Sequence, residues 1–502
     1  MNALTQRTRL GLEIAVVGVA AGVAGDALLR AMPWGLNVTI CTTAVVGAGV
    51  WLVRRHGFKP GPDAAWLAIT VLLLGAAFLR RDATTLATFD MLALILALSF
   101  GAASLQGERI SSWYPLDYVR GVVTGTAASI VGSLVLIFSD IKWLELPQDG
   151  RLRHVRGALL GTIIAAPLLV VFAALFASAD QVFDNVLANM FAFDMESVTS
   201  HALLFGFWGA LVAGYLRWSF LGRPVEIPGV IPKPVPSVVP LATALGLLNF
   251  LFLLFVVVQL RYFFGGAALV EETSGLTFAS YARQGFFELV TASGLVLPIL
   301  LGADHLVRGG TAAQVRVFRQ LGGLLLALLA VIMASALARM RLYTAAYGLS
   351  ADRLYATAFM ILLIGLCAWF AWTILRGARH RFAFGAFMQG LAVLAGLHLL
   401  NPDAFIVRTN LARPAATRPF DAEYALTLGA DAVPVLLDAL PRLGPADQCT
   451  IASSLLTRWY GKPADWRTWN WSRSRAIRLV TDRAESLRSA APRNVPCKGV
   501  KQ

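Results

Sequence analysis

The chain has 502 residues, of which 57% are hydrophobic and only 14% are charged. Soluble domains are about 45–50% apolar and about 25% charged, so this chain, with a mean hydropathy of +0.66, has too little polar surface to cover several soluble domains. These values exclude an ordinary cytosolic enzyme, a disordered protein and a collagen-like fibre. They predict a polytopic membrane protein.

The net charge of +14 does not indicate nucleic-acid binding, because the basic residues do not gather into one patch. They occur in short clusters between apolar runs, such as Arg80 with Arg81 and Arg379 with Arg381. Clusters of this kind are typical of the loops that set membrane topology. Four cysteines without a CxxC pair exclude a disulfide scaffold, a zinc ribbon and an iron–sulfur protein.

Long apolar runs follow one another from the first residues to about residue 400. A helix needs about 20 mostly apolar residues to cross the hydrocarbon core of a bilayer, and the runs are too unbroken for the alternating strands of a membrane barrel. The sequence therefore predicts an all-α polytopic transmembrane bundle of about 12 spans. The predicted spans are 10–31, 35–53, 63–79, 84–105, 120–140, 156–178, 200–220, 239–264, 285–305, 318–339, 353–376 and 382–400.

Two segments interrupt the apolar runs. Residues 222–238 contain five prolines and predict an extended linker between an amino-terminal bundle (1–221) and a carboxy-terminal bundle (239–400). After Asn401 the composition becomes that of a small soluble helical domain (401–502). In that tail, the apolar spacing of 420–440 predicts two short amphipathic helices, with Pro434 in the first turn of the second.

Basic residues in short loops predict the orientation. In the second half of the chain, the loops on the linker side carry Arg217, Arg223, Lys233, Arg308, Arg316, Arg319, Arg376, Arg379 and Arg381, whereas the alternate loops carry Arg261, Arg283, Arg339, Arg341 and Arg353. This asymmetry predicts a cytoplasmic linker and an external tail. The basic residues of the first half are divided equally. Twelve spans would place both termini outside, whereas a count that differs by one would place the amino terminus inside and leave the rest unchanged.

The segments 261–291 and 339–355 mix arginine, tyrosine and carboxylate residues at predicted span ends on the outward side. Ser350 is a predicted N-cap, and Arg353 falls in the first turn of the next span, where the helix dipole disfavours a cation. An arginine there needs a carboxylate partner or an anionic ligand. The predicted polar cluster comprises Tyr281, Arg283, Glu288, Arg339, Arg341, Tyr343, Tyr347, Arg353 and Tyr355. Three interpretations remain open: pairing with lipid headgroups or within the cluster, a ligand or catalytic site, or a surface for a partner.

Asp90 is an intramembrane carboxylate with apolar neighbours on both sides, so it is expected to face the bundle interior. It is either part of a proton or cation relay or a helix–helix hydrogen bond. The sequence contains no metal-binding, phosphate-binding or nucleophile–base motif, so no catalytic residue, metal or cofactor is predicted. Cys449 and Cys497 lie outside the apolar runs and form either a disulfide or two free thiols.

Four segments resemble a family of bacterial membrane proteins, the domain-of-unknown-function 4173 family in the wider 4153/4173 group. The segments are FASYARQGFFEL (278–289), RMRLYTAAYGLSADRLY (339–355), NPDAFIVRTN (401–410) and DAEYALTLGADAVPVLL (421–437). The resemblance covers about residues 160–440. It implies a multi-pass protein of the bacterial inner membrane and implies no particular activity.

Three functions are compatible with these features. In an envelope or sensory scaffold, the polar cluster holds the tail on the bundle. In a transporter or lipid-handling protein, Arg283, Arg339, Arg341 and Arg353 hold an anionic group while Glu288 or Asp90 is protonated in the cycle. A membrane-embedded enzyme is the third hypothesis. The expected partners are the lipid bilayer and its anionic headgroups, which would attract the basic tail.

Overall fold

The computed structural model describes residues 5–145, 195–222, 237–264, 286–308, 310–413, 419–462 and 465–491, with scattered positions between 161 and 183. Every regular element in this part of the chain is a helix, which confirms the all-α prediction. Ten of the described helices are long and apolar enough to cross a membrane. They are α1 (Gln6–Leu29), α2 (Leu36–His56), α4 (Thr84–Leu105), α5 (Pro115–Val135, extended by a π-turn to Asp140), α8 (Met195–Leu221), α9 (Val239–Phe264), α12 (Phe286–Leu306), α13 (Ala312–Tyr347), α14 (Ala351–Thr373) and α15 (Phe382–Leu400).

The other two predicted spans have different outcomes. The run at 63–79 forms α3 (Ala64–Ala77), which is apolar but only 14 residues long. The run at 156–178 lies mostly outside the described residues, as does most of the linker.

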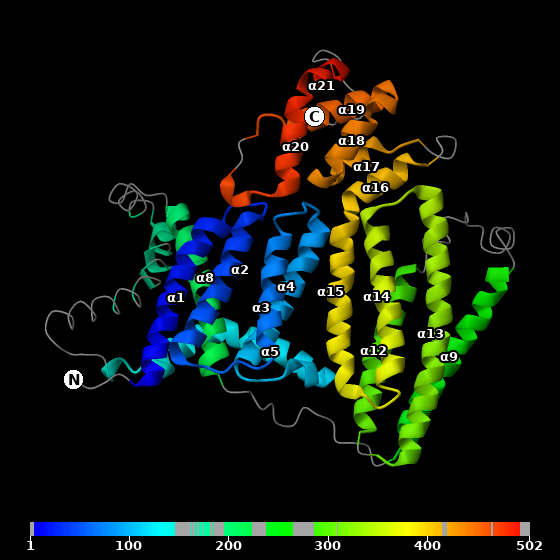
Figure 1. The fold of residues 1–502 in the computed structure, drawn as a ribbon, viewed down its shortest axis with the longest axis horizontal. Coiled ribbons are helices and arrows are strands. Elements are labelled where there is room, and N and C mark those ends of the chain that lie inside the picture. The colour runs from blue at the N-terminus through cyan, green and yellow to red at the C-terminus, as the bar shows by residue number, and fades with distance from the viewer. Residues whose placement is uncertain are drawn as a thin grey trace.

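The helix ends define two faces of the bundle (Figure 1). The tail contacts the α1–α2 and α3–α4 connections, the turn between α13 and α14, and the end of α15; we call this side the tail face. The opposite side, which we call the linker face, holds Leu221 at the end of α8 and Val239 at the start of α9.

Helix α5 lies across the bundle, because both of its ends are at the linker face (Figure 1). Near its start, the Tyr118 hydroxyl donates to the Ile110 carbonyl in the connection after α4. At its other end, Asp140 pairs with Arg7 in the first turn of α1 and with Arg217 near the end of α8. The first turn of α1 is therefore on the face opposite the tail, and not on the same face as twelve crossings would require.

Small residues allow α1, α5 and α8 to approach one another closely. A Cβ atom added to Gly132 of α5 would lie 2.9 Å from the backbone of Gly214 in α8, and one added to Gly18 of α1 would lie 2.8 Å from the Ala213 Cβ. In lipid, where no hydrophobic effect drives helices together, close backbone packing of this kind stabilises their association.

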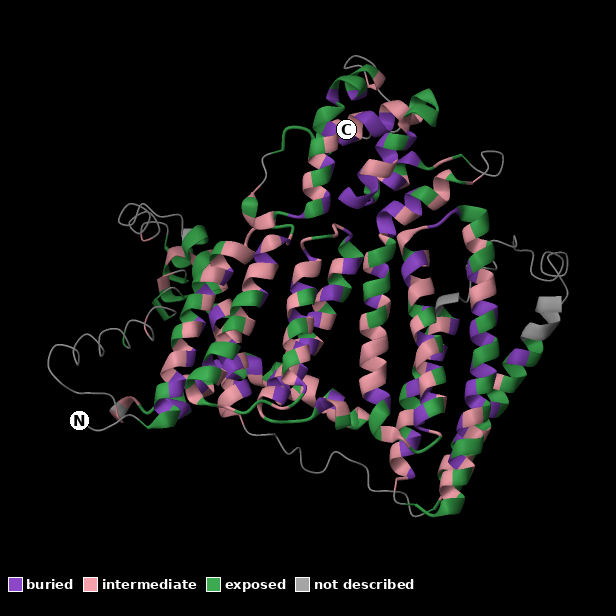
Figure 2. Ribbon diagram, in the orientation of Figure 1, coloured by how far each residue is buried: buried purple, intermediate pink, exposed green. Residues whose placement is uncertain are grey.

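Helix α15 joins the two halves of the bundle. Its Leu394 and Leu397 belong to one buried apolar cluster with Leu86 and Leu94 of α4 and Tyr355 of α14. The outward surfaces of the bundle are rich in exposed residues (Figure 2), among them many large apolar side chains suited to contact lipid.

The tail is a compact helical domain on the tail face (Figures 1 and 2). Its helices are α16 (Pro402–Leu411), α17 (Ala422–Thr427), α18 (Val433–Ala439), α19 (Pro445–Trp459), α20 (Trp471–Asp482) and α21 (Ala484–Ala490). Helices α17 and α18 confirm the two short helices predicted in 420–440, and Pro434 lies in the first turn of α18. The buried core of the tail also includes Leu349 and Leu354 from the bundle, so tail and bundle share apolar packing.

Candidate functional site

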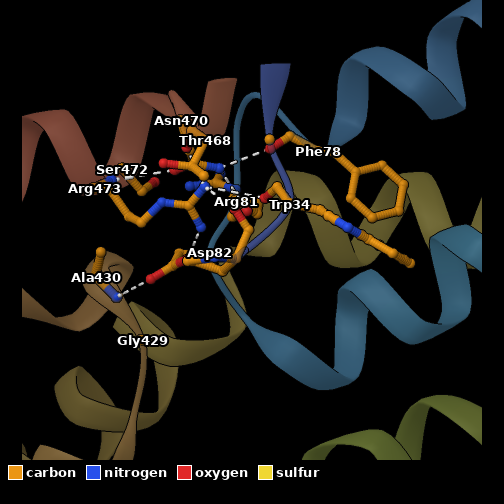
Figure 3. A network of polar contacts seen from close by, with 12 residues as sticks. Trp34, Phe78, Arg81, Asp82, Gly429, Ala430, Thr468, Asn470, Ser472 and Arg473 are labelled. Atoms are coloured by element: carbon orange, nitrogen blue, oxygen red, sulfur yellow. Dashed lines mark hydrogen bonds and ion pairs between the residues drawn. The ribbon is translucent and has the colours of Figure 1, made fainter. Parts of the chain in front are cut away.

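A buried polar network joins the tail to the turn between α3 and α4 (Figure 3). Asp431 of the tail is only 5% exposed. Its carboxylate accepts hydrogen bonds from the Arg81 guanidinium at 3.0 Å, from the Asp82 backbone N–H at 2.8 Å and from the Ser472 hydroxyl at 2.7 Å. A carboxylate removed from water needs such donors, and the bundle supplies two of the three to Asp431 when the tail is docked.

Arg473 of α20 makes the reciprocal contact (Figure 3). Its Nη1 donates to Asp82 Oδ1 at 2.6 Å, and its Nη2 donates to the carbonyl oxygens of Trp34 at 3.0 Å and Thr468 at 2.5 Å. Asp82 also accepts from the Ala430 backbone N–H at 3.1 Å. The tail and the bundle therefore exchange charged donors and acceptors in both directions.

Backbone groups extend the contact. The Asn470 side chain donates to the carbonyl oxygens of Phe78 and Arg81, which lie just after the end of α3. The Trp471 N–H donates to Leu79 O at 2.7 Å, and the Leu36 N–H donates to Trp469 O at 2.9 Å. These bonds satisfy polar groups at helix ends that would otherwise lose their partners on burial.

Asp403 lies beside this network, at the start of α16, and is 4% exposed. It accepts one hydrogen bond, from the Gly429 N–H at 2.8 Å. Burial raises the pKa of the Asp403 carboxyl to about 6, and the nearby carboxylates of Asp431 and Asp82 act in the same direction.

Asp90 faces the bundle interior, as predicted, and is 2% exposed. Its carboxylate oxygens lie 2.9 and 3.1 Å from Nε2 of His398 in α15. Arg81 donates to the His398 carbonyl oxygen at 2.7 Å. The intramembrane pair is thus linked through the His398 backbone to the network that holds the tail.

A second contact holds the tail on the turn between α13 and α14. The Asn410 side chain both accepts from the Leu349 N–H at 2.7 Å and donates to the Leu349 carbonyl at 2.8 Å. The Tyr424 hydroxyl accepts from the Ala351 N–H at 2.7 Å. Arg413 donates to the carbonyl oxygens of Ala345 and Ala346 at the end of α13.

This second contact encloses a cavity of about 520 Å³, which we call the hairpin groove. One side is formed by the α13–α14 turn with Arg353, and the other by the beginnings of α17 and α19. Three of the family-like segments noted in the sequence (339–355, 401–410 and 421–437) meet here, although they are far apart in the chain.

Only part of the predicted polar cluster comes together. Arg353 lies with its guanidinium carbon 4.1 Å from the centre of the Tyr343 ring and 5.9 Å from that of Tyr347, and it donates to the Gly348 carbonyl. Tyr355, on another side of α14, packs against Phe89. The remaining members are separate or outside the described residues: Arg339 is half-buried, Arg341 and Glu288 are exposed, and Tyr281 and Arg283 are not described.

Several docking residues were not among the sequence candidates, notably Asp82, Asp431 and Arg473. The sequence indicates Arg81 only as part of a basic cluster, with Arg80, in a loop that sets membrane topology. The sequence does not mark these residues as docking residues, because each is an ordinary charged residue of a loop or amphipathic helix. Their partners lie about 350 to 390 positions away in the chain, and only the tertiary fold brings them together.

The cysteines among the described residues include both free thiols and a disulfide-bonded residue. Cys449 is disulfide-bonded, whereas Cys41 and Cys367 are free thiols. Cys497 lies outside the described residues. Within the described ranges, no group of three or more His, Cys, Asp or Glu residues is placed to hold a metal ion.

Gly348 is required by the geometry of the hairpin groove. Its φ is +85°, and an added Cβ would lie 2.8 Å from Arg413 Nη1 and 2.9 Å from Asn410 Oδ1. We expect Gly348→Ala to lower the free energy of unfolding by about 1–3 kcal/mol, because it combines backbone strain with a displaced docking contact. Thermal unfolding of the purified protein measures the loss. Gly396→Ala, where an added Cβ meets nothing within 4 Å, is the matched control, and an equal effect at both positions would contradict the assignment.

Comparison with known proteins places the chain in a family. The sequence profile of DUF4153, a domain of unknown function, matches residues 68–439. No curated protein and no solved structure matches the chain. The match supports the wider 4153/4173 group rather than the 4173 name, and it begins earlier than the expected residue 160, so that it includes the α3–α4 turn that receives the tail. The chain therefore belongs to the family defined by the domain of unknown function DUF4153.

Proposed function

We propose that this protein is a scaffold or sensory platform of a bacterial inner membrane, on which the tail is a fixed extracytoplasmic module. The observation that carries the proposal is the two-sided exchange of buried charges, Arg81 with Asp431 and Arg473 with Asp82. The two pairs favour one defined position of the tail on the bundle, because a charge buried in this contact without its partner would cost about 3–5 kcal/mol.

The distribution of basic residues supports an external tail. Among the described bundle residues, the linker face carries Arg7, Arg9, Arg54, Arg55, Lys59, Arg109, Arg120, Lys142, Arg217, Arg308, Arg316, Arg319, Arg376, Arg379 and Arg381, and the tail face carries Arg30, Arg80, Arg81, Arg261, Arg339, Arg341 and Arg353. Because α5 lies across the bundle, the basic residues Arg7, Arg9, Arg54, Arg55 and Lys59 fall on the linker face. The basic residues of the first half, which the sequence alone divides equally between the two sides, are therefore in excess on the linker face. An excess of basic residues in short loops marks the cytoplasmic side, whereas long domains are translocated largely regardless of their charge.

The Cys449 disulfide supports the same orientation. Disulfides persist in oxidising compartments and are rare in the cytosol. With Cys41 and Cys367 free, Cys497 is the partner that we propose for Cys449.

The Asp90–His398 pair favours a second candidate function, proton-coupled transport. Ionisable groups inside a membrane often form proton relays. The scaffold is preferred because Asp90 has a hydrogen-bonding partner within the bundle, and because the hairpin groove is lined only by residues of the tail and of the α13–α14 turn.

Two variants distinguish these functions in a strain that lacks the gene and shows a phenotype. Asp90→Asn keeps a hydrogen-bonding group opposite His398 but cannot carry a proton, and we expect it to restore the phenotype as fully as the wild type. Arg473→Ala, which releases the tail, is expected to fail although the protein still inserts in the membrane. The reverse result, with Asp90→Asn inactive and Arg473→Ala active, would exclude the scaffold and favour transport.

A further inference from the structure

The hairpin groove lies at the level where the membrane helices end. The α13–α14 turn, the start of α4 and the end of α15 are all at the tail face, and the tail covers the groove from the other side. A cavity of about 520 Å³ is in the size range of small-molecule sites in proteins. Its position is that of phospholipid headgroups and of solutes at the membrane surface.

Two cations line the groove beside the α13–α14 turn, Arg353 in the first turn of α14 and Arg413 just after α16 of the tail. Arg353 donates to the Gly348 carbonyl and lies over the Tyr343 ring, while Arg413 donates to the carbonyls of Ala345 and Ala346. A guanidinium has five N–H groups, so each arginine is fixed by some of its donors and keeps others for a ligand.

Three carboxylates line the tail side: Asp421 and Glu423 at the beginning of α17, and Asp447 at the beginning of α19. Asp421 caps α17 by accepting from the Tyr424 N–H. Among the described residues, none of the three forms an ion pair within 4.0 Å with either arginine of the groove. Both signs of charge thus line one cavity without a direct ion pair between them.

We propose that the hairpin groove binds a zwitterionic phosphoamine, the chemistry of a phosphoethanolamine headgroup. Arg353 and Arg413 contact the phosphate, because guanidinium groups match phosphate oxygens in charge and geometry. Glu423 and Asp447 contact the ammonium group, since carboxylates and cations form strong charge-assisted hydrogen bonds. The proposal goes beyond the scaffold function and requires only that the tail is docked.

The test uses the full-length protein, freed of phospholipid in detergent, and titrates it with three soluble probes by calorimetry. We expect glycerophosphoethanolamine, which carries both charges, to bind at least tenfold more tightly than glycerol 3-phosphate or ethanolamine alone. Equal binding of glycerophosphoethanolamine and glycerol 3-phosphate, or no binding of either, would overturn the proposal.

Variants assign the two ends of the ligand. The double variant Glu423→Gln with Asp447→Asn removes no described ion pair, so we expect it to fold normally, to lose at least tenfold in affinity for glycerophosphoethanolamine and to bind glycerol 3-phosphate unchanged. Arg353→Gln is expected to weaken both phosphate probes. Asp482→Asn and Arg341→Gln alter exposed charges outside the groove and are the matched controls. Unchanged selectivity in the double variant would contradict the proposed ammonium contact.

A second arm identifies the source of the headgroup. The protein is placed in phosphatidylglycerol nanodiscs with or without phosphatidylethanolamine, and the titration with glycerophosphoethanolamine is repeated. If the bilayer supplies the ligand, phosphatidylethanolamine competes and raises the apparent Kd of the soluble probe. If a soluble phosphoamine is the ligand, the Kd stays the same in both nanodiscs.

Discussion

Replacing Arg473 with alanine is expected to release the tail from the bundle. The substitution removes the 2.6 Å bond to Asp82 and the donors to the Trp34 and Thr468 carbonyls. The side chains of Arg473 and Asp82 are each only 13% exposed, and breaking such a buried pair costs about 3–5 kcal/mol. This cost corresponds to a rise of about 10²- to 10⁴-fold in the population of undocked tail.

Limited proteolysis of the full-length protein in detergent measures this population, because cleavage follows the open fraction when opening and closing are fast. The matched control is Arg483→Ala, which breaks a pair with Asp438 whose side chains are 44% and 71% exposed. Exposed pairs contribute no more than about 1 kcal/mol, so cleavage should remain near the wild-type rate. Similar cleavage of Arg473→Ala and Arg483→Ala would show that the Asp82 pair does not hold the tail.

Replacing Asp403 with asparagine is expected to stabilise the protein at neutral and alkaline pH. Burial raises the pKa of this carboxyl to about 6 in the folded state, whereas an aspartate in an unfolded chain ionises near pH 3.9. Between these values the folded protein binds more protons than the unfolded chain, so the contribution of Asp403 to stability falls as the pH rises from about 4 through 6. Asparagine can still accept from the Gly429 N–H without becoming charged.

The expected gain at pH 8 is at most about 3 kcal/mol, and it should disappear towards pH 4. The charged groups that shift the pKa of Asp403 are Asp431, Asp82 and Arg458, and they are unchanged in the variant. Thermal unfolding of both proteins from pH 4.5 to 8 measures the difference, with the exposed Asp438→Asn as the control. A variant that is less stable than the wild type at every pH would show that the ionised carboxylate is needed for docking.

The helical membrane architecture could be predicted because it depends on local composition. Apolar length alone located most spans, and the position of Pro434 could be predicted because proline is favoured in the first turn of a helix. Helix α5 shows where this reasoning fails. Its length and hydropathy match those of a span, but its orientation depends on the pairing of Asp140 with Arg7 and Arg217, which no local pattern reveals.

The candidate site was predictable only in part for the same reason. The YGLS turn and Arg353 were recognised because Ser350 is an N-cap and a cation in a first turn is unusual, and Ser350 does accept from the Arg353 N–H. The partners of this turn, Asn410 and Tyr424, belong to family-like segments but were not paired with it, because the contacts span more than 60 residues.

The side of the membrane on which the tail lies is the central claim of the proposed function. It is tested by labelling Ser486→Cys, in exposed α21, with a membrane-impermeant maleimide in a chain where Cys41 and Cys367 are replaced by alanine. Lys59→Cys, on the linker face, is the matched position. We predict that Ser486→Cys reacts in intact cells and Lys59→Cys only after permeabilisation. Reaction of Lys59→Cys in intact cells, with Ser486→Cys protected until permeabilisation, would place the tail in the cytoplasm and contradict the account.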